Sequence, residues 1–262
     1  MHESEKSRLS IFAAVAFALA AIAAFAILAP RRPPLPIVTL PTPNGYETLA
    51  EAGATVVGIP NDFDETTDVE ALRACVDANA RAFDGITKAA TQDYAVPIDY
   101  QKGMQGVIDS MNHQQIRPAM RLMMVKARLA ELEEDYATAA ETQVSLLDHA
   151  EKIANEGVLV HVQVSLAYQG AALEGLIRLA PKLSQEAKAA TLATLQESKH
   201  PRMSIDAIQA REEALSFKDA GLIQRWQFSR LRKLAAPTYV QLKAQRAKAE
   251  VERQEVLALL AE

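Results

Sequence analysis

The sequence has few of the residues from which disulfides, metal cages and nucleic-acid surfaces are built. Its 262 residues include one cysteine, which excludes an internal disulfide and any metal cage of several thiolates. Aromatic residues make up only 5% of the chain. Lysine plus arginine (28) and aspartate plus glutamate (33) give a net charge of -5, which argues against a nucleic-acid-binding surface. With 49% hydrophobic residues, the chain should nevertheless fold around a core.

The patterns that usually carry chemistry are also missing. There is no Gly-x-Ser-x-Gly elbow and no phosphate loop. The acidic loop at residues 62–65 lacks the glycine and the glutamate that an EF-hand requires, and Cys75 lies beside an apolar stripe and is expected in the core. We therefore expect no catalytic, cofactor-binding or metal-ligating residues. The five histidines are His2, His113, His149, His161 and His200. No two of them have the four-residue spacing of a helical zinc site.

Residues 9–29 form an uncharged run of 21 residues. As a helix this run would measure about 31 Å, which matches a hydrocarbon core of roughly 30 Å. The alternative is a cleaved signal peptide, since Ala24-Phe25-Ala26 would suit a peptidase. The length of the run and the prolines directly after it favour an uncleaved anchor. We predict a short tail at residues 1–8, then a single transmembrane helix that binds the lipid bilayer.

The orientation of this anchor is not decided by charge, because two basic residues precede the run and two follow it. Eight residues precede it and 233 follow, which is the usual layout of a signal anchor with an exported domain. We therefore expect the bulk of the chain outside the cytoplasm. Small-residue pairs such as Ala14 with Ala18 leave a homodimer open.

After the anchor, residues 30–43 hold six prolines in 14 positions and should form an extended linker. Beyond it, apolar residues recur every three, four or seven positions, which predicts an all-α domain of six to eight helices over residues 44–262. Residues 158–164 alternate like a strand, but the apolar segment continues for about 23 residues, which favours a helix. Expected elements are a helix after Asn44-Gly45, one helix from Thr67-Asp68 to Ile86, helices at 99–111, 118–132, 137–150 and 158–180, helices capped by Ser184 and Ser204, and, after breaks at Pro201 and Pro237, a helix at 238–260.

The hairpin expected at residues 126–150 has a turn near Glu134. The residues at its centre, 129–139 (LAELEEDYATA), resemble the turn between the two helices of a tetratricopeptide repeat. That family has glycine where Glu134 stands and an apolar residue where Lys126 stands. No second copy lies one period of 34 residues away, so the hairpin is partly tetratricopeptide-like and no repeat array is expected.

The order of features along the chain carries a broader resemblance. An apolar span, a proline linker, Pro43-Asn44-Gly45-Tyr46, the helical hairpin and later Arg211-Glu212-Glu213 resemble a group of uncharacterised bacterial single-pass membrane-anchored helical proteins. The resemblance implies an envelope location and a helical fold. It implies no activity and no site residues.

Charge is distributed unevenly along the chain. Residues 30–224 carry 18 basic and 27 acidic side chains, whereas residues 225–253 carry eight basic and two acidic ones. The basic segment is amphipathic and either docks on the acidic helices of its own domain or binds an anionic membrane or an acidic partner. The candidate surface residues are Arg225, Trp226, Arg230, Arg232 and Lys233.

Three functional hypotheses follow. The favoured one is a non-enzymatic interaction or scaffolding module of the bacterial envelope, whose partner is another envelope protein. The second is an envelope enzyme whose site assembles from His113, His149, His161 and acidic residues distant in sequence. The third is a peripheral membrane-surface module that uses the basic segment.

Overall fold

The computed structural model describes residues 33–111, 113–198, 203–218 and 221–262, without the side chains of residues 113–114 and 222–235. Within these ranges every regular element is a helix and no strand occurs, which confirms the all-α prediction. The elements are α2 (Gly45–Ala54), α3 (Val69–Ala78), α4 (Ala80–Ala90), the 3-10 helix η1 (Tyr100–Lys102), α5 (Met104–Ser110), α6 (His113–Leu132), α7 (Tyr136–Lys152), α8 (Leu159–Leu179), the 3-10 helix η2 (Ala180–Lys182), α9 (Gln185–Glu197), α10 (Ile205–Phe217) and α11 (Leu222–Ala261).

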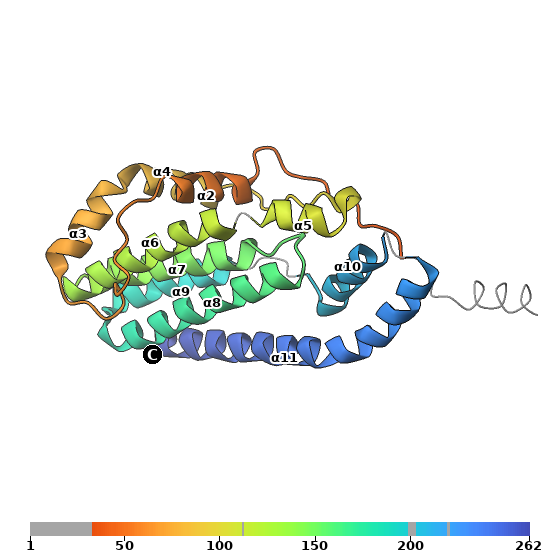
Figure 1. The fold of residues 1–262 in the computed structure, drawn as a ribbon. Helices are drawn as coiled ribbons and strands as arrows, with labels where there is room; N and C mark the ends of the chain where they lie inside the picture. The colour runs from red at the N-terminus through yellow and green to blue at the C-terminus, as the bar shows by residue number, and fades with distance from the viewer. Residues whose placement is uncertain (1–32, 112, 199–202, 219–220) are drawn as a thin grey trace, which may run out of the picture.

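The helices lie in layers around a central set (Figure 1). Helices α6 to α9 form the middle, α2 to α4 cover one side of it, and α11 runs along the other side against α8 and α9. Helices α5 and α10 lie at the end of the molecule where residues 33–43 join, opposite α3. One apolar cluster reaches from α2 to α11 and holds the layers together. Its fully buried members include Leu49, Met120, Leu147, Leu176 and Val256.

Several helix starts lie where the sequence predicts them. The side chain of Asn44 accepts a hydrogen bond from the amide of Tyr46, and those of Ser184 and Ser204 each accept one from an amide three residues later. These bonds satisfy amides that the first turn of a helix leaves without a partner. Residues 158–164 are the cap and first turns of α8, so the helix interpretation of this segment is confirmed.

The turn of the predicted hairpin is also confirmed. Helix α6 ends at Leu132, α7 begins at Tyr136, and Glu134 between them has a φ of 61°. This left-handed backbone is unfavourable for a residue with a Cβ, because the Cβ crowds the following carbonyl. Asp135 then caps α7 by accepting a hydrogen bond from the amide of Thr138.

The single helix predicted from Thr67-Asp68 to Ile86 is wrong, because it divides at Asn79 into α3 and α4. The amide of the Asn79 side chain donates to the carbonyls of Cys75 and Val57, and its oxygen accepts from the amide of Val57. These bonds replace the backbone bonds of a continuous helix. Helix α3 begins after Asp68, which accepts a hydrogen bond from the amide of Ala71.

Other predicted boundaries also need correction. Residues 99–111 form η1 and α5 rather than one helix, since Gly103 between them has a φ of 60°. Helix α6 begins at His113, ahead of Pro118. The break predicted at Pro237 is wrong, because α11 continues through it and bends instead (Figure 1). The described residues thus form ten α-helices and two 3-10 helices, more than the six to eight expected.

The predicted anchor at residues 9–29 lies outside the described residues. Among those that the structure describes, no helix combines the length and the apolar character needed to cross a bilayer.

Candidate functional site

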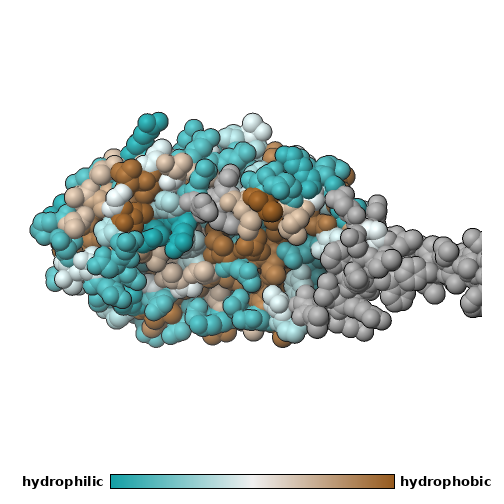
Figure 2. Space-filling model, in the orientation of Figure 1, coloured by the Kyte–Doolittle hydropathy of each residue, from teal (hydrophilic) through white to brown (hydrophobic). Residues whose placement is uncertain are grey.

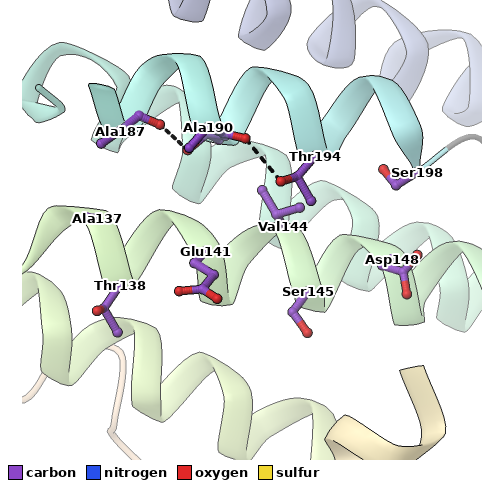
Figure 3. Close-up of a pocket in the computed structure, with 11 residues that line it drawn as sticks. Ala137, Thr138, Glu141, Val144, Ser145, Asp148, Ala187, Ala190, Thr194 and Ser198 are labelled. Carbon is purple, nitrogen blue, oxygen red and sulfur yellow. Dashed lines mark hydrogen bonds between the residues drawn. The ribbon is translucent and has the colours of Figure 1, made fainter. Parts of the chain in front are cut away.

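A groove with a volume of about 510 Å³ lies between α7 and α9 (Figure 3). Its walls follow residues 137–148 of α7 and residues 187–198, which comprise most of α9 and the residue after it. Each wall is about 17 Å long, or about three helical turns. Most of its side chains are small; the lining residues are Ala137, Thr138, Glu141, Val144, Ser145, Asp148, Ala187, Ala190, Thr191, Thr194 and Ser198.

The charge along this groove is acidic. Glu141 and Asp148 stand on the α7 wall seven residues apart, close to two helical turns, and Figure 3 shows both beside the opening. Asp148 also accepts a hydrogen bond from Lys152 at 2.7 Å. The Thr191 and Thr194 hydroxyls donate to carbonyls of α9 itself. The groove therefore offers small, mostly self-satisfied side chains with acidic groups on one wall.

The histidines of the enzyme hypothesis lie in the core. His149 and His161 are each 0% exposed. The hydroxyl of Tyr94 lies 2.6 Å from Nδ1 of His149, and the amide of Val158 donates to Nδ1 of His161. The ring of Tyr46 lies 6.4 Å from that of His161. Both imidazoles are thus packed among helices and segments that hold them away from solvent, while the side chain of His113 lies outside the described residues.

Burial sets the protonation of these groups. It lowers the pKa of His149 to about 4, and the nearby carboxylate of Asp148 only partly opposes this shift. Burial likewise raises the pKa of Tyr46 and of Tyr94. A neutral His149 beside a neutral Tyr94 is a hydrogen-bonded core pair at ordinary pH.

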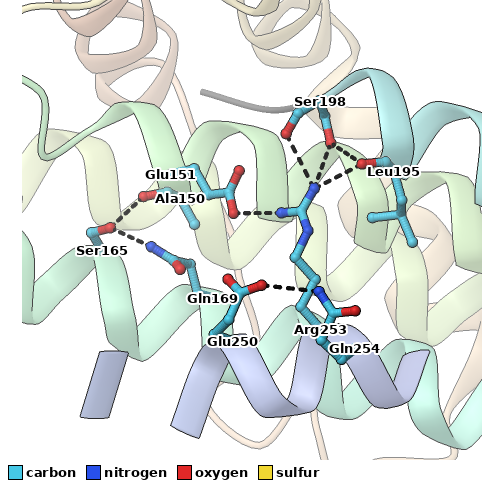
Figure 4. Close-up of polar contacts among 9 residues, drawn as sticks. All are labelled: Ala150, Glu151, Ser165, Gln169, Leu195, Ser198, Glu250, Arg253 and Gln254. Carbon is cyan, nitrogen blue, oxygen red and sulfur yellow. Dashed lines mark hydrogen bonds and ion pairs between the residues drawn. The ribbon is translucent and has the colours of Figure 1, made fainter. Parts of the chain in front are cut away.

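A buried ion pair joins α11 to α7 (Figure 4). Nη1 of Arg253 donates to Glu151 at 2.6 Å, and both side chains are at least nine-tenths buried. Nη2 donates to the carbonyl of Leu195 at 2.7 Å and to that of Ser198 at 3.2 Å, at the C-terminal end of α9. Basic groups are favourable at this end of a helix. The guanidinium therefore fastens three helices at one point beside the end of the groove.

A second carboxylate, that of Glu131 in α6, forms ion pairs with two basic side chains at the opposite end of the hairpin. Arg178 donates to both of its oxygens, at 3.1 and 2.8 Å, and Lys182 donates at 3.2 Å. Burial opposes ionisation of Glu131, but the hydrogen bonds and charges of Arg178 and Lys182 outweigh it and lower its pKa. This cluster ties α6 to the end of α8 and to η2.

The side chains of the predicted surface, Arg225, Trp226, Arg230, Arg232 and Lys233, lie outside the described residues; only their helix, α11, is described. Both interpretations of the basic segment stay predictions.

The other sequence candidates occupy structural positions. Asp62 and Asp64 are exposed, whereas Phe63 between them is buried under the side chain of Arg121, 5.2 Å from its ring. Cys75 is buried, which raises its pKa. The described residues contain no group of three or more side chains arranged to hold a metal ion.

The chain matches no protein-family model, and no curated protein or solved structure is detectably similar to it.

Sequence patterns did not reveal the groove or the Arg253 pair. The small residues of α7 and α9 recur at helical spacing, but so do alanines on many exposed helix faces. Glu151 and Arg253 are 102 residues apart, and nothing local connects them. Only the packing of α9 and α11 around α7 gives these residues a common role.

Proposed function

We propose that this protein is a membrane-anchored, non-enzymatic interaction module of the bacterial envelope, and that the groove between α7 and α9 binds a helix of a partner protein. The observation that carries the proposal is the groove itself, which has a volume of about 510 Å³ between two walls of mostly small side chains. The anchor is residues 9–29, predicted from the sequence, and the folded domain is extracytoplasmic.

The shape of the groove favours a helix as the occupant. Two parallel rows of side chains about three turns long match the length of a short helix. Alanine, serine and threonine on both walls allow the backbone of a third helix to come close, as small residues do at tight helix crossings. A helix with a narrow face of small residues would thus fill the groove without displacing α7 or α9.

The charge of the groove indicates which helix fits. Asp148 is already paired with Lys152, whereas Glu141 is exposed on the same wall, so a partner with a basic residue opposite Glu141 would complement the groove. Such charges mainly steer association and select the partner, while apolar contact supplies most of the affinity.

The test is co-purification of the full-length protein from its native membrane in mild detergent. Ala190 lines the groove, and Ala189 beside it is exposed but does not. Ala190→Trp fills the groove and should abolish stoichiometric recovery of a partner that the parent protein retains. Ala189→Trp adds the same side chain outside the groove and should retain that partner.

Two results would contradict the proposal. One is a partner that binds the parent protein and both variants equally, since the groove would then play no part. The other is a parent protein that retains no partner, even after cross-linking.

A further inference from the structure

Most of the exposed large apolar side chains belong to two segments at one end of the molecule. Of the eight exposed large hydrophobic side chains in the described part, two lie on the linker and three on or just after α5. Figure 1 shows the linker and α5 at the same end of the molecule, and Figure 2 shows hydrophobic atoms at the surface in this region. We call this set the apolar end patch; it consists of Ile37, Leu40, Met104, Ile108 and Met111.

Helix α5 is divided into an apolar and a polar side. Met104, Ile108 and Met111 follow a spacing of four and three and so share one side, where they are 57%, 55% and 36% exposed. On the other side Asp109 accepts hydrogen bonds from Gln105 at 2.7 Å and from Lys102 at 3.3 Å. The polar groups therefore satisfy one another, and the apolar side stays partly exposed in the described structure.

The chain outside the structure limits what can lie opposite this patch. Leu35 already packs against the core, and the predicted anchor ends at Ala29. Six residues span at most about 22 Å even when fully extended. The linker end of the domain is thus held close to the bilayer surface, and Ile37, 96% exposed, is only two residues beyond Leu35.

We infer that the apolar end patch rests in the headgroup region of the bilayer that holds the anchor, and so fixes the orientation of the domain on the membrane. Apolar side chains with a polar border are typical of surfaces that insert shallowly into this region. Burial of exposed apolar surface there is favourable by about 25 cal/mol per Å². The inference rests on the membrane anchor of the proposed function, but not on the α7–α9 groove.

The experiment places a spin label on the full-length protein in nanodiscs of phosphatidylethanolamine and phosphatidylglycerol. Cys75 is the only cysteine, so a Cys75→Ala background accepts single labels. Ile108→Cys reports on the patch. Val251→Cys, an equally apolar and 67% exposed position on α11, is the matched control. Collision with dissolved oxygen and with a water-soluble nickel complex measures whether each label lies in lipid or in water.

The expected result is a severalfold lower accessibility to nickel and a higher accessibility to oxygen at residue 108 than at residue 251. Equal accessibility at the two sites, in protein that resists extraction by alkaline carbonate, would show that the patch does not contact the bilayer although the anchor is present. Protein released by carbonate would overturn the anchor and the patch together.

A second copy of the chain could cover the same face. Protection of residue 108 from nickel without a gain in oxygen accessibility, together with dipolar coupling between labels on two chains, would assign the patch to a dimer and overturn contact with lipid.

Discussion

The two sides of α7 show how one helix can serve both stability and binding. Toward α6 and α8 its side chains, such as Leu146 and Leu147, are at most 1% exposed, and its polar residues Glu151 and His149 find partners across helix boundaries. Toward α9 it presents small side chains and a groove. The closed side can therefore carry the stability of the domain while the open side remains free to bind.

The largest expected effect comes from removing Arg253, which joins α7 to α11 and to the end of α9. Arg253→Ala removes the guanidinium from Glu151, from the carbonyl of Leu195 in α9 and from that of Ser198 just after α9. Removing one member of a buried pair costs about 3–5 kcal/mol. The free energy of unfolding, measured by denaturant and circular dichroism, should fall by that amount.

The control for this variant is on the same helix. Lys248 pairs with Glu252 at 3.3 Å, but its side chain is 77% exposed. Lys248→Ala should cost less than about 1 kcal/mol, because solvent screens exposed pairs. A loss for Arg253→Ala no greater than this would show that the buried pair does not fasten α11 to α7.

Acid should weaken the closed side through His149. Its pKa is near 6.5 when unfolded and about 4 when folded, so the neutral ring stabilises the fold above pH 6.5. That stability is lost as the pH falls toward 4. The loss is about 2 kcal/mol by pH 5 and about 3 kcal/mol in full. His149→Gln, which does not titrate, should lose correspondingly less between pH 7 and pH 5 in parallel denaturation series.

If the parent protein and His149→Gln lose the same stability over this pH range, the burial of His149 does not cause the acid sensitivity of the fold. Glu212 cannot account for such a loss, because burial raises the pKa of its carboxyl and protonation therefore favours the folded state.

Two glycines of α8 test how tightly α7 packs on this side. A Cβ at Gly175 would lie 2.6 Å from the side chain of Gln143 on α7, whereas Gly170 has nothing within 4 Å. Gly175→Ala should therefore cost about 1–3 kcal/mol through overpacking. Gly170→Ala should stabilise the helix by about 0.5–1 kcal/mol. The unfolding temperatures of the two variants should shift in opposite directions. Shifts in the same direction would mean that α7 and α8 rearrange to accommodate the added methyl group.

The smallest effect is expected on the open side. Ala190→Leu projects into the groove, and exposed substitutions of this kind usually change stability by less than about 0.5 kcal/mol. An unfolding transition unchanged from the parent protein is the expected result. A loss above 1 kcal/mol would mean that the groove closes in solution and that the two sides of α7 do not differ.

Local signals predicted a large part of this fold. Caps such as Asn44, Ser184 and Ser204 and the turn at Glu134 are encoded within a few residues, and the structure confirms them. The division at Asn79 was missed because it depends on Val57, 22 residues away.

The candidate site was harder to predict. Its walls come from helices separated by α8, and an alanine stripe alone does not distinguish a groove from an exposed face. The continuous path of α11 through Pro237 was missed for a related reason, since helix packing elsewhere along the chain can outweigh one lost hydrogen bond.

The contact between Arg253 and Glu151 also has a consequence for the time course of synthesis. Ribosomes add roughly 5–20 residues per second, so the 102 residues between these two take about 5–20 s to make. During that interval α7 and its neighbours can assemble, but Glu151 lacks this guanidinium and the end of α9 lacks its donor. The nascent domain should therefore become resistant to proteases only after residue 253 has emerged, which makes α11 the step that completes the fold.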